Sequence, residues 1–343
     1  MANSQIGTPR FYTDQISYLM SRGIGQDGNF DVITGSNLIG IQTGSEAELF
    51  DMRPLNKVDF NTSAADTDHV LINIDTQSTS TKKSFVAILN HNTVSADAKI
   101  LIKASNTESH VQAVNMGSAT AMDTPVEVVN ADAIASSIVT PETDGSTIVK
   151  FTEQSLRYWG IQFEGNSSNT FSSTDLFVGC ILIGEYYDMP HAPDLNITRM
   201  ISYNRMNDLQ ESYGGQRFSN LKSFGRTAGS TSKSPFTTGS NGYDSYGGRI
   251  IYDMSFSFLD STNLMPDEYH IVAADDSFVA DVWNMTNGNH LPFIFSIDKS
   301  SEGSDADNAE SEHIFARFAN NSLDMAQVAP NVFNMKLTIE EEF

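Results

Sequence analysis

The residue types that could do chemistry are present in this chain, but their spacing fits no familiar catalytic or metal-binding motif. Seven histidines and 43 carboxylates are scattered over 343 residues. A serine nucleophile elbow, a phosphate-binding loop or a zinc protease helix would need G-x-S-x-G, G-x-x-x-x-G-K or H-E-x-x-H, and none of these occurs. The chain has one cysteine, Cys180, whereas a thiolate zinc site of the finger type needs at least two. The sequence therefore predicts a protein that is not an enzyme and has no metal site or cofactor.

Two polar residues, His91 and Asn92, occupy a short turn between an apolar run at 85–89 and an alternating segment at 99–104. One role for this pair is contact with a ligand, such as a host surface glycan, at the rim of a β-sandwich. The other is structural, because His and Asn side chains can hydrogen-bond the backbone of a turn and fix it. We favour the structural role from the sequence.

The segment 302–312 is an acidic loop whose carboxylates could in principle supply oxygen ligands to a cation. They are Asp305, Asp307, Glu310 and Glu312. The loop lacks the glycine and the ordered spacing of an EF-hand. A run of like charges is more often a solvated loop, which is the interpretation that we favour.

The charge of the chain is strongly acidic, with a formal net charge of −23. Such a chain repels phosphate backbones and anionic lipid, so we expect neither nucleic acid nor membrane insertion. Against this background, residues 196–250 carry seven basic and three acidic residues. The basic residues proposed as subunit-interface candidates are Arg199, Arg205, Arg217, Lys222, Arg226 and Arg249.

Much of this basic region, residues 213–248, is rich in Gly, Ser, Thr and Tyr and has few aliphatic residues to bury. Three interpretations stay open for this arm: nucleic-acid contact, a flexible linker, or an arm that orders on an acidic neighbouring subunit. Charge complementarity favours the third, because copies of so acidic a chain offer many carboxylates to arginine.

Hydrophobic patterning predicts a mostly β protein with a short N-terminal helix. Thr8-Pro9 looks like the start of that helix, and alternation then predicts short strands with polar turns, typical of a jelly-roll sandwich. Lys99 and Lys103 are expected to face solvent, whereas 176–183, apolar at every position, predicts a central strand. We predict three parts: an N-terminal helix and arm at 1–45, a jelly-roll sandwich at 46–192, and a second β-rich domain at 193–343.

The N-terminus shows no secretory pattern, and no apolar run approaches the roughly 20 residues that cross a bilayer. These features predict a chain made in a cytoplasm.

The order of these runs resembles a known family. SFVAILNHNTVSADAKILI, then LRYWGIQFEG, then LFVGCILIGEYYDMP are similar to the galactose-binding-like, or discoidin-like, jelly-roll module of tailed-phage structural proteins. His91, Asn92, Trp159, Ile161 and Gly184 match the pattern. The segments ESYGGQRF and RIIYDMSFSFL are similar to the second β domain that often follows this module.

The resemblance implies a non-enzymatic virion protein, assembled in the host cytoplasm, of the tail, baseplate or fibre-attachment apparatus. Its partners would be other virion proteins and copies of itself, in a homo-oligomer. The alternatives are a carbohydrate-binding receptor-recognition module and a capsid decoration protein. Polysaccharide cleavage by converging carboxylates is a further hypothesis, although the sequence selects no pair.

Overall fold

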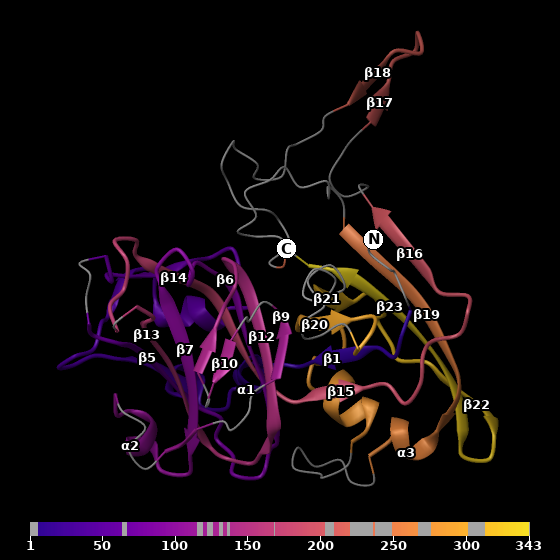
Figure 1. The fold of residues 1–343 in the computed structure, drawn as a ribbon. Coiled ribbons are helices and arrows are strands. Elements are labelled where there is room, and N and C mark those ends of the chain that lie inside the picture. Colours follow the sequence, from indigo (N-terminus) through magenta and orange to yellow (C-terminus); the bar gives the residue numbers. More distant parts are fainter. Residues whose placement is uncertain are drawn as a thin grey trace.

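The fold is mostly β, with two β-rich halves and one short N-terminal helix, as the sequence predicts (Figure 1). The computed structural model describes residues 6–63, 67–114, 119–121, 126–129, 133–135, 138–167, 169–202, 209–219, 236, 249–266, 276–300 and 313–342. Within these residues, no helix is long and apolar enough to cross a membrane.

The first half is a sandwich of two antiparallel sheets. One sheet has the order β3-β4-β14-β6-β12-β9. Its strands are β3 (Ile41–Thr43), β4 (Val58–Phe60), β14 (Leu176–Gly184), β6 (Lys83–His91), β12 (Gly145–Gln154) and β9 (Val126–Val129). The other has the order β10-β11-β7-β13-β5-β2, with β8 also paired to β7. Its strands are β10 (Ala133–Ala135), β11 (Ile138–Thr140), β7 (Ala98–Ser105), β13 (Tyr158–Gly165), β5 (Val70–Asp75), β2 (Phe30–Ile33) and β8 (Thr120–Ala121).

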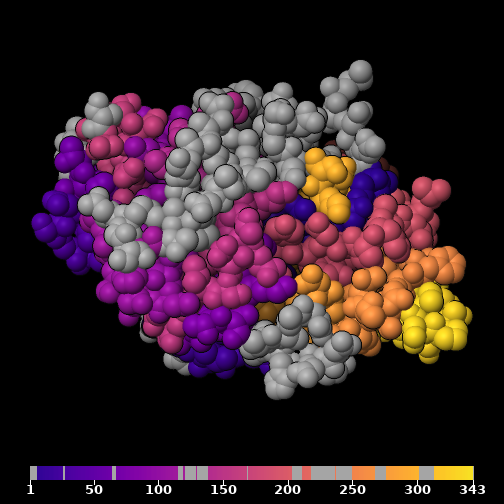
Figure 2. All heavy atoms as spheres, turned by 60° about the horizontal axis from the view of Figure 1, so that its bottom comes forward, coloured from indigo at the N-terminus to yellow at the C-terminus, as the bar shows by residue number. Residues whose placement is uncertain are grey.

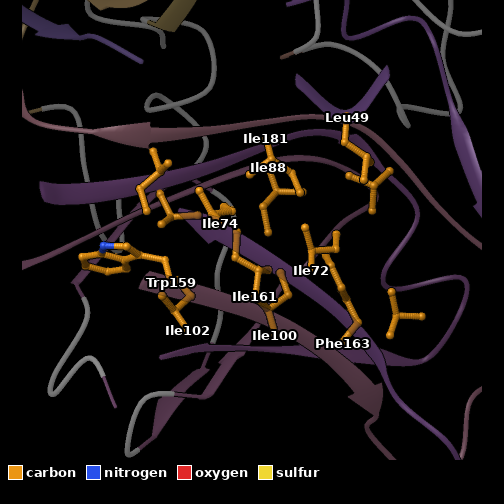
Figure 3. Packing of buried hydrophobic residues seen from close by; sticks show 14 of the residues in the cluster. Leu49, Ile72, Ile74, Ile88, Ile100, Ile102, Trp159, Ile161, Phe163 and Ile181 are labelled. Carbon is orange, nitrogen blue, oxygen red and sulfur yellow. The ribbon is translucent and has the colours of Figure 1, made fainter. Parts of the chain in front are cut away.

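The core of the sandwich forms where alternate side chains of the two sheets meet (Figure 3). On β13, Trp159, Ile161 and Phe163 are fully buried, and Ile161 lies opposite Ile72 on β5 and Ile102 on β7. Successive side chains of a strand point to opposite faces, so the alternation in the sequence becomes one continuous apolar face. The alternating patterns that predicted these strands are confirmed.

The prediction that Lys103 faces solvent is wrong. Its side chain is fully buried, and its Nζ donates to the carbonyl of Ala113 and, at 3.3 Å, to Oε1 of Gln162. The chain after β7 turns back through α2 (Glu108–Val111), which packs on β7 and β13 and covers this face. Burial lowers the pKa of Lys103 to about 8.

The N-terminal segment joins the two halves of the molecule. Residues 10–12 form a strand, β1 (Arg10–Tyr12), and the helix α1 (Gln15–Ser21) begins only after it. Asp14, not Thr8, is the N-cap: its carboxylate accepts from the backbone N–H of Ser17 at 2.7 Å and of Ile183, on β14, at 2.9 Å. The predicted start at Thr8 is therefore wrong, because pairing with two other strands holds residues 10–12 extended.

The second half is built on a sheet with the order β15-β1-β20-β21-β23-β19-β16, with β22 also paired to β23. Its strands besides β1 are β15 (Tyr186–Asp188), β20 (Phe293–Ser296), β21 (His313–Phe318), β23 (Val332–Glu341), β19 (Arg249–Asp260), β16 (Thr198–Ser202) and β22 (Met325–Ala329). The short helix α3 (Ser261–Leu264) and the π-helix η3 (Val279–Asn284) cover its core. The C-terminal strand β23 lies between β21 and β19.

The two halves pack through a third apolar cluster. Leu182 and Cys180 on β14 and Phe85 on β6 contribute from the sandwich, and Ile294 and Phe315 contribute from the second sheet. Both faces of β14 are consequently buried, which confirms it as a central strand. Cys180 is fully buried, as expected of a small apolar side chain.

Three further short elements complete the described chain: the 3-10 helices η1 (Gln26–Asn29) and η2 (Glu46–Phe50), and a separate hairpin of β17 (Leu209–Glu211) and β18 (Arg217–Ser219). Strands β1 and β15 precede the predicted 192/193 boundary but belong to the sheet of the second half, where β1 also pairs with β20 beyond that boundary. The three-part division of the chain stays a prediction.

Candidate functional site

The structure places three of the interface candidates. Arg199 on β16 is exposed, and its guanidinium carbon lies 5.7 Å from the centre of the Tyr252 ring. Arg217 pairs with Glu211 of its own hairpin at 3.1 Å. Nη1 of Arg249 donates to Oε1 of Glu340 at 3.3 Å.

Three other interface candidates, Arg205, Lys222 and Arg226, lie outside the described residues, as does the acidic loop 302–312. An interface role for the six basic residues and the interpretation of the acidic loop as a solvated loop stay predictions.

His91 and Asn92 lie inside the sandwich rather than on its rim, at 1% and 5% exposure. Nε2 of His91 lies 2.8 Å from Oγ1 of Thr147, and Nδ1 lies 2.9 Å from Oγ1 of Thr93. Asn92 donates to the carbonyl of Asp175 and accepts from the N–H of Phe177, which ties the turn to β14. These contacts match the structural role of the pair.

We expect His91→Ala to lower the free energy of unfolding by about 1–3 kcal/mol, because two buried hydroxyls lose a hydrogen-bond partner. Burial lowers the pKa of His91 to about 4, so the ring is neutral at neutral pH and its loss removes no charge. Urea denaturation measures the effect. Exposed His290, changed to Ala, is the control and should change stability by less than about 0.5 kcal/mol. Equal effects of the two changes would contradict the structural role.

One hollow of the described residues lies between the two halves. It has a volume of about 360 Å³ and is bordered by the ends of β6 and β12, by the chain from Glu185 to Pro190, and by α3 and η3. Figure 2 shows the face on which the magenta atoms of the sandwich meet the salmon and orange atoms of the second half. The lining side chains include Phe151, Thr152, Glu153, Glu185, Tyr186, Tyr187, Asn263, Asp276 and Asp281. We call this hollow the interdomain cleft.

One lysine, Lys82, holds the carboxylates of the interdomain cleft together. Its Nζ lies 3.2 Å from Glu153, 3.2 Å from Asp276 and 3.9 Å from Glu185. Glu153 belongs to the sandwich and Asp276 to the second half, so the cluster links the two. Within the described residues, no group of His, Cys, Asp and Glu is arranged to hold a metal ion.

Glu185 is the unusual carboxylate of the cleft. Burial and the neighbouring Asp281 raise its pKa to about 8, and the attraction of Lys82 at 3.9 Å offsets only part of this rise. At neutral pH the carboxyl therefore holds its proton and can both donate and accept a hydrogen bond. The carboxylates of Glu153 and Asp276 next to it accept hydrogen bonds, so the cleft offers a ligand both a hydrogen-bond donor and hydrogen-bond acceptors.

Raising the pH should destabilise the protein through Glu185. The unfolded chain releases this proton near the ordinary pKa of 4.5 and the folded chain near 8, so the stabilisation is lost as the pH rises between those values. We expect the melting temperature of the native protein to fall between pH 5 and pH 8.5 by at least about 2 °C more than that of Glu185→Gln. Parallel melting curves for the two proteins would show that Glu185 titrates normally.

The sequence analysis missed the interdomain cleft. Its lining comes from segments between Ser84 and Asp281 that meet only when the two halves pack. The one local signal is the run Glu185–Asp188, EYYD, which places two aromatic rings between two carboxylates directly after a central strand.

The fold and the cleft define a two-part β protein with a jelly-roll sandwich and a polar cleft at its junction. No family model and no curated protein matches the chain. Similar solved structures include chitosan-binding module 1 of a chitosanase/glucanase from Paenibacillus sp. IK-5, at 12% identity and a TM-score of 0.27 over 43% of this chain and 93% of that one. CpGH89CBM32-6 from Clostridium perfringens is also 12% identical, with a TM-score of 0.27 over 47% and 97%.

A third similar structure is a truncated AlyQ with CBM32 and alginate lyase domains, 14% identical, with a TM-score of 0.26 over 71% of this chain and 51% of that one. All three TM-scores are low.

Proposed function

We propose that this chain binds a carbohydrate in the interdomain cleft and does not cleave it. The observation that carries the proposal is the cleft, whose volume of about 360 Å³ falls at the low end of the range for small-molecule sites. Sites of this kind often lie between domains. The function would be recognition of a glycan by a non-catalytic protein.

The lining chemistry favours a polyhydroxylated ligand. Sugar hydroxyls are donors as well as acceptors, and Glu153 and Asp276 accept whereas protonated Glu185 can also donate. Phe151 and Tyr186 add aromatic surface to the same cleft. An apolar ligand would leave these carboxylates desolvated and without partners, which is costly.

The charge of the cleft sets a limit on the glycan. The cleft is lined by five carboxyl groups, and the ammonium group of Lys82 lies within 4 Å of three of them, those of Glu153, Glu185 and Asp276. Sulfated or phosphorylated sugars would meet like charge there. The proposed ligand is therefore a neutral oligosaccharide.

Binding without cleavage follows from the ion pairs. Hydrolysis of a glycoside needs an acid and a free carboxylate as base or nucleophile. Glu185 has the raised pKa of an acid, but Glu153 and Asp276 are both held by Lys82 at 3.2 Å. The cleft therefore has groups that can hydrogen-bond a sugar, but its carboxylates Glu153 and Asp276 are paired with Lys82 and are not free to act as base or nucleophile.

A glycan array with the full chain tests the proposal, followed by chromatography of the bound oligosaccharide after long incubation. We expect reproducible binding to a neutral glycan class and recovery of the oligosaccharide intact. Absence of binding to every neutral glycan at millimolar concentration would refute carbohydrate recognition. Release of shorter sugars would refute the non-catalytic part.

A second candidate is the virion structural role expected from the sequence, in the tail, the baseplate or the capsid surface. The specific observation in its favour is the hairpin of β17 and β18, which stands away from both halves (Figure 1) and is exposed from Glu211 to Arg217. A free two-stranded hairpin is marginally stable, so a neighbouring subunit would explain it. A particle reconstruction that includes this chain would test the role, and absence of the chain from purified particles would refute it.

A further inference from the structure

One edge of the second sheet concentrates exposed apolar side chains. Leu195, Met200, Ile201 and Phe258 are 103%, 43%, 55% and 78% exposed. Met200 and Ile201 are successive residues of β16 and point to opposite faces of the sheet at this edge, and the chain before β16 continues beside the second half of β19. There the N–H of Asp194 donates to the carbonyl of Ser255 at 2.8 Å, and the hydroxyl of Ser257 donates to Asp194 at 2.8 Å. We call residues 194–202 with Phe258 the apolar edge.

Phe258 is unusual in conformation as well as in exposure. Its φ is +63°, in the left-handed region, at a bulge of β19 between Phe256 and Leu259. Such a backbone costs of order 1–3 kcal/mol for a residue other than glycine. Its N–H donates to Oδ1 of Asn334 at 3.1 Å, which fixes the bulge. The strained backbone thus holds the Phe258 ring exposed to water, where it buries little apolar surface against its own chain.

Strand β16 ends the sheet. Within the described residues its partner strand is β19, and Figure 1 shows it along the outer border of the second half. Alternate backbone N–H and C=O groups of a strand point to its two sides, so an end strand offers a row of them to another strand. Natural edges usually carry charged residues or proline to prevent such pairing, and β16, TRMIS, has one charge and no proline.

The lack of acidic residues at this edge favours a second copy of the chain as the partner. No Asp or Glu occurs from residue 195 to residue 202, although the chain carries 43 of them and a net charge of −23. Two copies of so acidic a chain repel over most of their surface, and this segment is where they can approach without that cost. The exposed hairpin of β17 and β18 begins seven residues after β16 ends, and it would extend over the partner.

We propose that β16 pairs with β16 of a second copy, antiparallel about a two-fold axis at Met200, so that the two second-half sheets become one continuous sheet. This register places Met200 opposite its own copy and Thr198 opposite Ser202. Arg199 then faces Ile201, and the two arginines do not oppose each other. Such a contact is isologous, the commonest form of a homodimer, and it does not depend on the carbohydrate proposal.

Disulfide trapping on the full chain tests the dimer. Residues directly opposite in an antiparallel pair have Cα atoms about 4.5–5.5 Å apart, within the range that a disulfide spans. Met200→Cys should therefore yield at least tenfold more covalent dimer on mild oxidation than Val328→Cys, a control of similar exposure on β22. The native Cys180 is fully buried and should contribute little.

Sedimentation over a hundredfold range of concentration gives the second measurement. The native chain should be a dimer that dissociates on dilution, and Met200→Lys should weaken the dimer at least tenfold with an unchanged melting temperature. A native chain that is monomeric at every concentration would overturn the proposal. It would do so even if β16 were found to pair with a strand of a different protein. Equal trapping by the two cysteine variants, or a Met200→Lys dimer of native affinity, would overturn it as well.

Discussion

Trp159→Ala is expected to lower the free energy of unfolding of the sandwich by about 3–5 kcal/mol. The indole is fully buried, stacks on Phe151 with ring centres 5.3 Å apart, and donates to the carbonyl of Leu156 at 2.9 Å. Truncation removes this apolar contact and leaves a cavity between the two sheets. Urea denaturation followed by circular dichroism measures the change at the transition of the sandwich.

The control for this change is Tyr213→Ala, which removes an aromatic ring that is fully exposed at the tip of the hairpin. It should alter the free energy of unfolding by less than about 0.5 kcal/mol. If the two changes cost the same, Trp159 would not be the centre of the sandwich core.

Thr152→Trp is expected to abolish glycan binding, with a loss of affinity of at least about 100-fold. Thr152 is an exposed residue on β12 that lines the interdomain cleft, so a large ring at this position would occupy the space of the ligand. The carboxylates and Lys82 are untouched, and aromatic residues are well accommodated in strands. Calorimetric titration with the best array glycan measures the loss.

Thr43→Trp is the matched control. Thr43 is also an exposed threonine on a strand of the same sheet, β3, but it does not border the cleft. This variant should bind the glycan with native affinity. Loss of binding in both variants would indicate a general effect of the added ring, and retention in both would place the ligand elsewhere.

The strands of the molecule were largely predictable from the sequence, because alternation directly reports which side chains face a core. Met254 and Phe256 on β19 and Ile161 on β13 are buried where the alternation places them. Lys103 was not predictable in this way, because the segment that covers it returns through α2 only after the strand has ended. The start of α1 was missed because strands β15 and β20, whose residues opposite Arg10 are 178 and 286 positions further along the chain, hold residues 10–12 extended.

The interdomain cleft could not be predicted, because its properties arise from packing between distant segments. Glu185 and Asp281 are 96 residues apart, and the raised pKa of Glu185 requires both the second carboxylate and burial by the second half. The turn at His91 and Asn92 was the visible candidate, but its polar side chains are hydrogen-bonded to threonine hydroxyls and to backbone groups inside the sandwich. Local sequence shows which residues are polar, but not which of them border a common cavity.

A crystal structure of the chain with the neutral glycan that binds best on the array tests carbohydrate recognition at the cleft most directly. The account predicts a sugar ring in the interdomain cleft, with hydroxyls within 3.2 Å of the carboxyl groups of Glu185 and Asp276. A glycan bound instead at the loops around His91, or anywhere outside the cleft, would contradict it.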